Sequence, residues 1–139
     1  MLGVISPVYF IPEDWDVVER KLQKIQVMLE QPLQAEIIEA GIMIVNTVKI
    51  LISVAYPPSS SPFNPPHMRT GQLQESYDIL EIGDYFVDVG SDLGYAFSLE
   101  FGNGKMLPRP HFFGTAMEVI KDFPRLFLTK VTDEVGRTG

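Results

Sequence analysis

The sequence predicts an α+β fold, with a small antiparallel sheet packed against two N-terminal helices and a C-terminal helix in a single domain. Apolar residues recur with helical spacing over roughly the first 55 positions, alternate with polar residues between 76 and 89, and return to helical spacing after Phe112. The chain has 139 residues and is 45% hydrophobic, which suffices for one core without cross-links. We therefore expect residues 1–139 to form one domain.

The first predicted helix covers residues 13–30. Two acidic residues, Glu13 and Asp14, open it and suit the positive end of the helix dipole. Pro32 is expected to stop or kink the helix, because a proline has no backbone N–H to donate. The ten residues before the helix lack the basic start and the cleavage site of a signal peptide, and predict an early strand or arm. The apolar stripe of this helix steps by three and four and consists of Trp15, Val18, Leu22, Ile25 and Leu29.

The second predicted helix covers residues 33–55 and ends before Pro57-Pro58. Apolar residues occur nearly all round its later half, which indicates a helix covered on more than one side. The sequence leaves open whether the cover is the rest of the domain or a neighbouring subunit. Asn46 and Lys49 interrupt its apolar run, which falls short of the ~20 apolar residues of a membrane span, so we expect a buried helix.

A loop rich in proline and serine follows at residues 57–69. Such a composition disfavours helix and central strand, and favours extended or disordered conformations. Long loops inside small domains are usually functional or mobile, so reaching a partner is one role open to this segment.

The pattern then changes to a period of two. Residues 76–81 and 85–89 predict the strands of an antiparallel hairpin, joined by a turn at Ile82-Gly83-Asp84. Residues 95–101 alternate as a strand would, yet Gly102 would equally suit the end of a short helix. Periodicity leaves both alternatives open.

The last predicted helix begins near Phe112. Pro124 lies inside its pattern and is expected to kink the helix or to split it into two shorter ones. The polar residues 133–139 predict a flexible tail.

The charge distribution argues against a grip on nucleic acid. The net charge is −7, and no basic residue occurs between Arg69 and Lys105. Sequence-independent binding to phosphates needs Lys and Arg along one face. The simplest interpretation of the acidic interval is a solvated surface. It contains Glu75, Asp78, Glu81, Asp84, Asp88, Asp92 and Glu100.

The familiar motifs of catalysis and cofactor binding are absent. The chain has no cysteine, which excludes disulfides, thiolate zinc sites and cysteine nucleophiles. The FGNGK stretch at 101–105 resembles half of a phosphate loop, but Leu99 replaces its first glycine and Met106 its Ser or Thr. Its glycines predict a tight turn instead. The two histidines have no metal-ligand spacing, and there is no GxSxG serine motif. We expect no metal and no cofactor.

One enzymatic alternative remains, a small acidic hydrolase using Glu100 and His111. Glu100 stands between apolar neighbours, which suits a general acid, although a pairing with Arg109 or Lys105 is the commoner arrangement. A nucleophile, base and oxyanion set is not evident, so the chain is not expected to be an enzyme. A cytoplasmic protein-binding module is a further alternative.

Four segments taken together resemble a known family. They are RTGQLQES at 69–76, VG at 89–90, YAFSLEFGNG at 95–104, and PRP at 108–110 followed by Phe112. In this order they look like the tail-component, or neck, family of long-tailed bacteriophages, typified by the tenth gene product of phage HK-ninety-seven. The likeness covers about half the chain, from 69 to roughly 127, and leaves out the N-terminal decapeptide and the 57–68 loop.

The resemblance implies a structural protein of the virion, made in the host cytoplasm and placed at the head–tail joint or the top of the tail. It implies a ring, of six or twelve copies, that contacts neighbouring connector and tail proteins while DNA passes through its channel. Specific nucleic-acid binding and membrane binding are not expected. The family offers no catalytic residues to carry over.

Two sets of residues are candidates for this role. A stiff, proline-flanked arginine beside aromatic residues is typical of an interface anchor, and it suits an ordinary strand-to-helix connection equally well. A channel that lets DNA pass needs a surface that does not hold phosphates, so we expect acidic residues of the hairpin to face it. The expected interface set is Tyr95, Glu100, Phe101, Arg109 and Phe112, and the expected channel set is Asp78, Glu81, Asp84 and Asp88.

Overall fold

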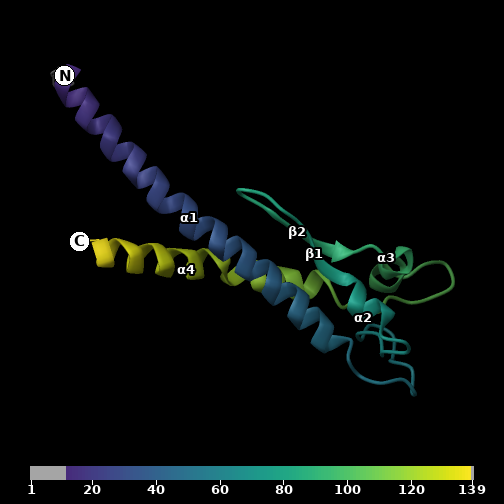
Figure 1. Ribbon diagram of the computed structural model, residues 1–139. Coiled ribbons are helices and arrows are strands. Elements are labelled where there is room, and N and C mark those ends of the chain that lie inside the picture. The colour runs from purple at the N-terminus through teal and green to yellow at the C-terminus, as the bar shows by residue number, and fades with distance from the viewer. Residues whose placement is uncertain (1–11, 139) are drawn as a thin grey trace, which may run out of the picture.

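The computed structural model describes residues 12–138 and confirms the α+β class. Figure 1 shows one long helix, α1, crossed by the C-terminal helix α4, with a β-hairpin beside the second half of α1 and two short helices near its C-terminal end. The expected strand or arm at the N-terminal decapeptide lies outside the described residues. The core is formed by the second half of α1 together with the hairpin, the short helix α3 and the start of α4.

Helix α1 spans Pro12–Leu51 without a break, so the prediction of two N-terminal helices was wrong. Pro32 lies inside this helix. A proline in a helix interior costs roughly 3 kcal/mol. Residues that favour helix stand on both sides of it, and the later half of α1 packs on the hairpin and on α4, which offsets the cost.

The predicted hairpin is confirmed, with its strand ends moved by one or two residues. Strand β1 covers Tyr77–Ile82 and pairs antiparallel with β2, Val87–Ser91. Their register sets Ile79 opposite Val89, and a bulge follows before Glu81 meets Asp88. The hairpin packs closely on α1 at Gly41, where a Cβ atom would lie 3.0 Å from the side chain of Val87. A glycine therefore permits this approach of helix to sheet.

Two short helices complete the body. Helix α2 covers Gln72–Ser76, and helix α3 covers Gly94–Phe101, so the helical alternative for residues 95–101 is the correct one. Gly102 ends α3 with a φ of 74°, a conformation that favours glycine. A Cβ atom there would lie 2.8 Å from the carbonyl oxygen of Met106, so the tight turn leaves no room for a side chain.

Helix α4 spans Phe113–Thr138 and also continues through its proline, Pro124. The expected split into two helices does not occur, because Pro124 lies on the exposed side and the chain around it keeps helical geometry. Residues 133–138, expected as a tail, are part of this helix. Lys130 ties α4 to α1, since its Nζ lies 3.2 Å from Oε1 of the buried Glu36. Apart from this ion pair, Oε1 has no hydrogen-bond partner among the described residues.

The proline-rich loop folds back onto the body. Met68 donates its N–H to the carbonyl of Val54 at 2.7 Å, and Tyr56 donates to the carbonyl of Met68 at 2.9 Å. Further along, Phe63 donates its N–H to Pro108 at 2.8 Å. The loop thus closes one end of the molecule, and it brings Ser60 to Arg109 in the segment that precedes α4 and Ser59 to Arg69 before α2.

Candidate functional site

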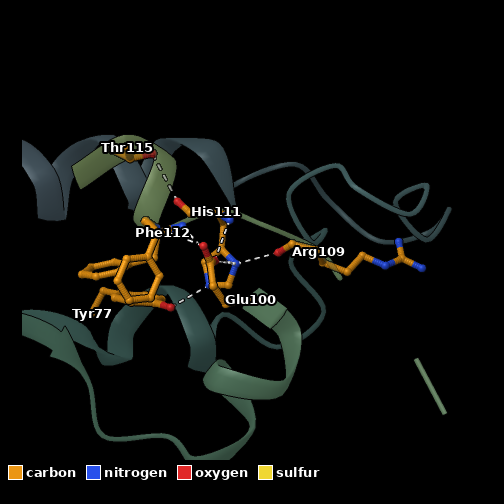
Figure 2. A network of polar contacts seen from close by, with 7 residues as sticks. Tyr77, Glu100, Arg109, His111, Phe112 and Thr115 are labelled. Atoms are coloured by element: carbon orange, nitrogen blue, oxygen red, sulfur yellow. Dashed lines mark hydrogen bonds and ion pairs between the residues drawn. The ribbon is translucent and has the colours of Figure 1, made fainter. Parts of the chain in front are cut away.

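The most tightly organised polar cluster lies where α3 meets α4 (Figure 2). Glu100, on α3, is only 7% exposed, and its carboxylate accepts three backbone N–H groups. The N–H groups of His111 and Phe112 lie 2.8 and 3.0 Å from Oε2, and that of Phe113 lies 3.0 Å from Oε1. The first N–H groups of a helix have no partner within it, and a negative charge there also suits the helix dipole. Glu100 therefore caps α4 from another element.

His111 completes this cluster with both ring nitrogens. Its Nδ1 lies 2.8 Å from the carbonyl oxygen of Arg109 and 3.2 Å from Oε2 of Glu100, so Nδ1 carries the proton and donates it. Nε2 then accepts a hydrogen bond from the Tyr77 hydroxyl at 2.6 Å. Burial raises the pKa of Tyr77 well above its usual range, and the negative charge of Glu100 raises it further.

The cluster is better suited to hold a helix than to perform acid–base chemistry. Tyr77, Glu100 and His111 are each 7% exposed or less, and each polar atom named above already has a partner. A general acid needs to reach the reacting group of a substrate. None of these three residues lines the cavities at the loop end of the molecule or beside the N-terminal half of α1.

The structure corrects the expected partner of Glu100. Neither Arg109 nor Lys105 pairs with this carboxylate within the described chain. The guanidinium of Arg109 points away from the cluster in Figure 2, and its Nη1 donates to Oγ of Ser60 at 2.5 Å. Arg109 enters the cluster only through its backbone, because its carbonyl oxygen accepts from His111.

The expected interface residues fall into two groups. Tyr95 and Phe101 are exposed, whereas Phe112 is half-buried and stacks on Tyr77 with ring centroids 5.4 Å apart. Phe101 belongs to an exposed aromatic row with Phe97 and Phe113, at centroid distances of 4.7 and 5.2 Å. The row joins α3 to α4, and the sequence analysis did not identify its two outer members. The four-residue spacing of Phe97 and Phe101 would have placed them on one face of a helix, but the sequence pattern of residues 95–101 fitted a strand equally well.

The expected channel residues all lie exposed on the hairpin or its turn. They are Asp78, Glu81, Asp84 and Asp88. Glu81 and Asp88 stand directly opposite each other in the register, an arrangement in which like charges destabilise the sheet. None of the four forms an ion pair with another described residue.

A cavity of about 410 Å³ lies at the loop-bearing end of the molecule. The proline-rich loop, the start of α2, helix α3 and the segment before α4 all contribute to its wall. Arg69 and Arg109 both line it, and neither forms an ion pair within residues 12–138. Sequence reasoning singled out Arg109 but not its convergence with Arg69, which only the folded loop produces.

The N-terminal half of α1 makes a second unusual surface. Figure 1 shows it extending away from the body as a single helical arm. From Trp15 to Leu29, all of which the structure describes, no side chain is buried. Leu22, Ile25 and Val27 are each more than half exposed.

Comparison of the chain with protein-family models, curated proteins and solved structures finds no match. Among the described residues there is no group of three or more His, Asp or Glu side chains placed to hold a metal ion. No helix within residues 12–138 is long and apolar enough to cross a membrane.

Proposed function

We propose that this protein is a structural subunit of the virion of a long-tailed bacteriophage. It acts at the head–tail joint or the top of the tail, as one member of a ring around the DNA channel. The observation that carries the proposal is the helical arm of residues 17–29, on which no apolar side chain is buried by the described part of the chain.

The arm has the spacing of a helix that packs on other helices. Val18, Leu22, Ile25 and Leu29 follow one another by four, three and four residues, as in a coiled-coil seam. Fully burying such a side chain stabilises by roughly 1.5–3 kcal/mol. A partner that covers the arm therefore gains several favourable contacts, which supports an assembly role.

The four segments that resemble the phage neck family occupy positions that define the shape of the body. Gly71 precedes α2 with a φ of 81°, and Gly102 ends α3 with a positive φ. Glu100 caps α4, and the Pro-Arg-Pro segment leads into that helix. These roles are structural, and they agree with a family that carries no catalytic residues.

The outward face of the hairpin suits a channel. Asp78, Glu81 and Asp88 are exposed on its strands, and no described lysine or arginine lies opposite them. Such a surface repels phosphate groups and lets a DNA duplex slide past. The exposed aromatic row of Phe97, Phe101 and Phe113 supplies a further apolar contact for a neighbouring subunit.

Electron microscopy of virions in which this chain carries a C-terminal tag tests the proposal. We expect the label at the head–tail joint or tail top. The double variant Leu22→Asp, Ile25→Asp should fold normally yet fail to enter particles, while Gln23→Asp on the same arm should enter them. Purified virions that lack the chain would contradict the proposal. Turnover in a hydrolysis screen of the purified chain would favour the hydrolase alternative instead.

A further inference from the structure

The cavity at the loop end has an apolar wall and a basic rim. Ile52, Leu73, Leu99 and Met106 supply apolar side chains, while Arg69 and Arg109 supply guanidinium groups. Its volume of about 410 Å³ lies within the range of roughly 300–1,000 Å³ typical of ligand sites. A matching occupant combines an apolar or aromatic side chain with a negative charge.

Two consecutive serines each contact one of the two guanidinium groups. Arg109 donates from Nη1 to Oγ of Ser60 at 2.5 Å, and Arg69 lies within 3.5 Å of Oγ of Ser59. Arg69 also stacks over the ring of Tyr56, 4.4 Å from its centroid. These contacts fix both side chains without neutralising either.

Neither cavity arginine has a carboxylate beside it among the described residues, although the chain is acidic. The chain contains eighteen acidic residues and eleven basic ones. Lys130, Arg125 and Arg137 each have an acidic partner, whereas the two cavity arginines, like most of the basic residues, form no ion pair within residues 12–138. Two like charges held close together repel each other, and a carboxylate placed between two guanidinium forks removes that cost.

The tip of the β-hairpin carries the complementary chemistry. Its turn presents Asp84 next to Tyr85 and Phe86, whose side chains are 61% and 50% exposed. The N–H of Gly83 donates to the carbonyl of Phe86 at 2.9 Å and closes the turn. Tyr85 donates its hydroxyl to Glu30 at 3.1 Å, which holds the tip against α1. The tip is thus an acidic, aromatic projection with a fixed shape.

A chain cannot place this tip in its own cavity. The tip lies beside Gln34, whose side chain reaches the carbonyl of Gly83, and the cavity lies beside Ile52. About five turns of α1 separate these two positions, a distance of roughly 27 Å at the rise of an α-helix. The occupant must therefore come from another molecule.

We propose that the cavity receives the hairpin tip of a second copy of this chain. The Asp84 carboxylate lies between Arg69 and Arg109, and an aromatic side chain of the tip fills the apolar part. This contact rests on the proposed ring and names the surfaces that join its members. Tip and cavity are different surfaces, so the association is head-to-tail and closes into a ring when its rotation permits. Asp84 then contacts a neighbour, while the acidic residues of the strands remain on the channel side.

Charge reversal tests the contact in purified protein. The double variant Arg69→Glu, Arg109→Glu and the single variant Asp84→Arg should each abolish self-association at concentrations where the unchanged chain associates, because the tip and the rim then carry charge of the same sign. A mixture of the two variants should associate again, since each tip meets a rim of opposite charge. Sedimentation velocity measures the outcome, and circular dichroism verifies that both variants fold. A mixture that stays monomeric while the unchanged chain associates overturns the proposal.

Cysteine cross-linking captures the contact even where association is weak, and the chain has no cysteine of its own. Tyr85→Cys and Thr70→Cys place one thiol on the tip and one in the cavity wall, and both leave Asp84, Arg69 and Arg109 in place. Oxidation of the mixed variants should give at least tenfold more cross-linked dimer than a mixture of Asp16→Cys with Thr70→Cys. An equal yield from both mixtures overturns the contact.

Different results would contradict the tip-to-cavity contact and the proposed function. Cross-linking of tip to cavity in a protein that is absent from virions keeps the contact and removes the neck role. Presence of the chain in virions, without any tip-to-cavity cross-link in protein or particle, keeps the role and overturns the contact.

Discussion

The junction of α3 and α4 differs sharply from the N-terminal arm of α1 in how far its side chains are buried and paired within the chain. At the α3–α4 junction, Glu100, His111 and Tyr77 are buried, and their polar atoms are paired within the chain. Along the arm, Leu22 and Ile25 have the spacing of core residues but stay more than half exposed. The first region determines the fold of the subunit, and the second offers surface to another molecule.

The same contrast exists within one helix. The second half of α1 contributes Ile44 and Val48 to the core, whereas the first half contributes no buried side chain between Trp15 and Leu29. Both halves carry apolar residues at helical spacing. An apolar stripe therefore predicts that something covers a helix, without saying whether the cover belongs to the same chain.

The largest effect is expected at the junction. Glu100→Ala removes the acceptor of three N–H groups and should lower the free energy of unfolding by on the order of 3–5 kcal/mol, because buried donors are left unpaired. Urea denaturation followed by circular dichroism measures this loss. Glu118→Ala, an exposed position on α4, is the matched control and should change stability by less than about 0.5 kcal/mol. Equal losses in both variants would show that the junction is not the cap described.

A pair of identical substitutions compares the two halves of α1 directly. Ile44→Ala should cost about 2–5 kcal/mol, since it opens a cavity in the core. Ile25→Ala should leave the stability of the isolated chain within about 0.5 kcal/mol and reduce assembly instead. Denaturation and particle incorporation are measured for both. A stability loss at Ile25 equal to that at Ile44 would mean that the arm packs within its own chain.

The junction also predicts a response to alkaline pH. The unfolded chain releases the Tyr77 proton near pH 10, while the folded chain keeps it to higher pH because burial raises the pKa of this hydroxyl. Stability from this group is therefore intact below pH 10 and falls as pH rises above it. Tyr77→Phe should cost about 1–3 kcal/mol at neutral pH by leaving Nε2 of His111 without its donor. Its denaturation midpoint should fall less steeply than that of the unchanged chain above pH 10, and an identical slope would contradict the description of Tyr77.

The smallest effect is expected at the contact between the two long helices. Lys130 is itself exposed, but it is the ion-pair partner of the buried Glu36. Glu36 and Glu39 raise the pKa of the Lys130 amine, so its charge persists through the neutral range. Lys130→Gln should destabilise modestly, and the double variant with Glu36→Gln should recover part of the loss because no buried charge is then unpaired. Purely additive losses, measured by a double-mutant cycle, would show that the two groups are not coupled.

Local patterns predicted the elements that depend only on neighbours in sequence. The alternation around Tyr77 and Val89 located the hairpin, and the spacing after Phe112 located the last helix. The predictions that Pro32 would end a helix and that Pro124 would split one were wrong. The free-energy cost of a proline is local, whereas the packing that offsets it extends along the rest of the helix. The 95–101 stretch could not be decided from its period, and contacts of α3 with the core decided it.

The candidate sites show the same division. The sequence identified Glu100, His111 and Arg109 as notable, but it assigned Glu100 to a pairing with a basic side chain. The structure pairs Glu100 with backbone N–H groups that lie eleven to thirteen residues away, and it turns Arg109 toward Ser60 in a distant loop. Spacing along the chain carries no information on such contacts when a turn of irregular geometry separates the partners.

By itself the sequence determined the α+β class, the acidic interval without a basic residue, and the apolar stripe of α1, since these follow from composition and from periods of two and 3.6. Only the tertiary structure decided that the stripe splits into a buried half and an exposed arm, that Glu100 is a helix cap, and that Arg69 and Arg109 meet at one cavity. The reason is physical: burial and pairing depend on which distant segments fold together, and the free energy of those contacts is absent from any local stretch of the chain.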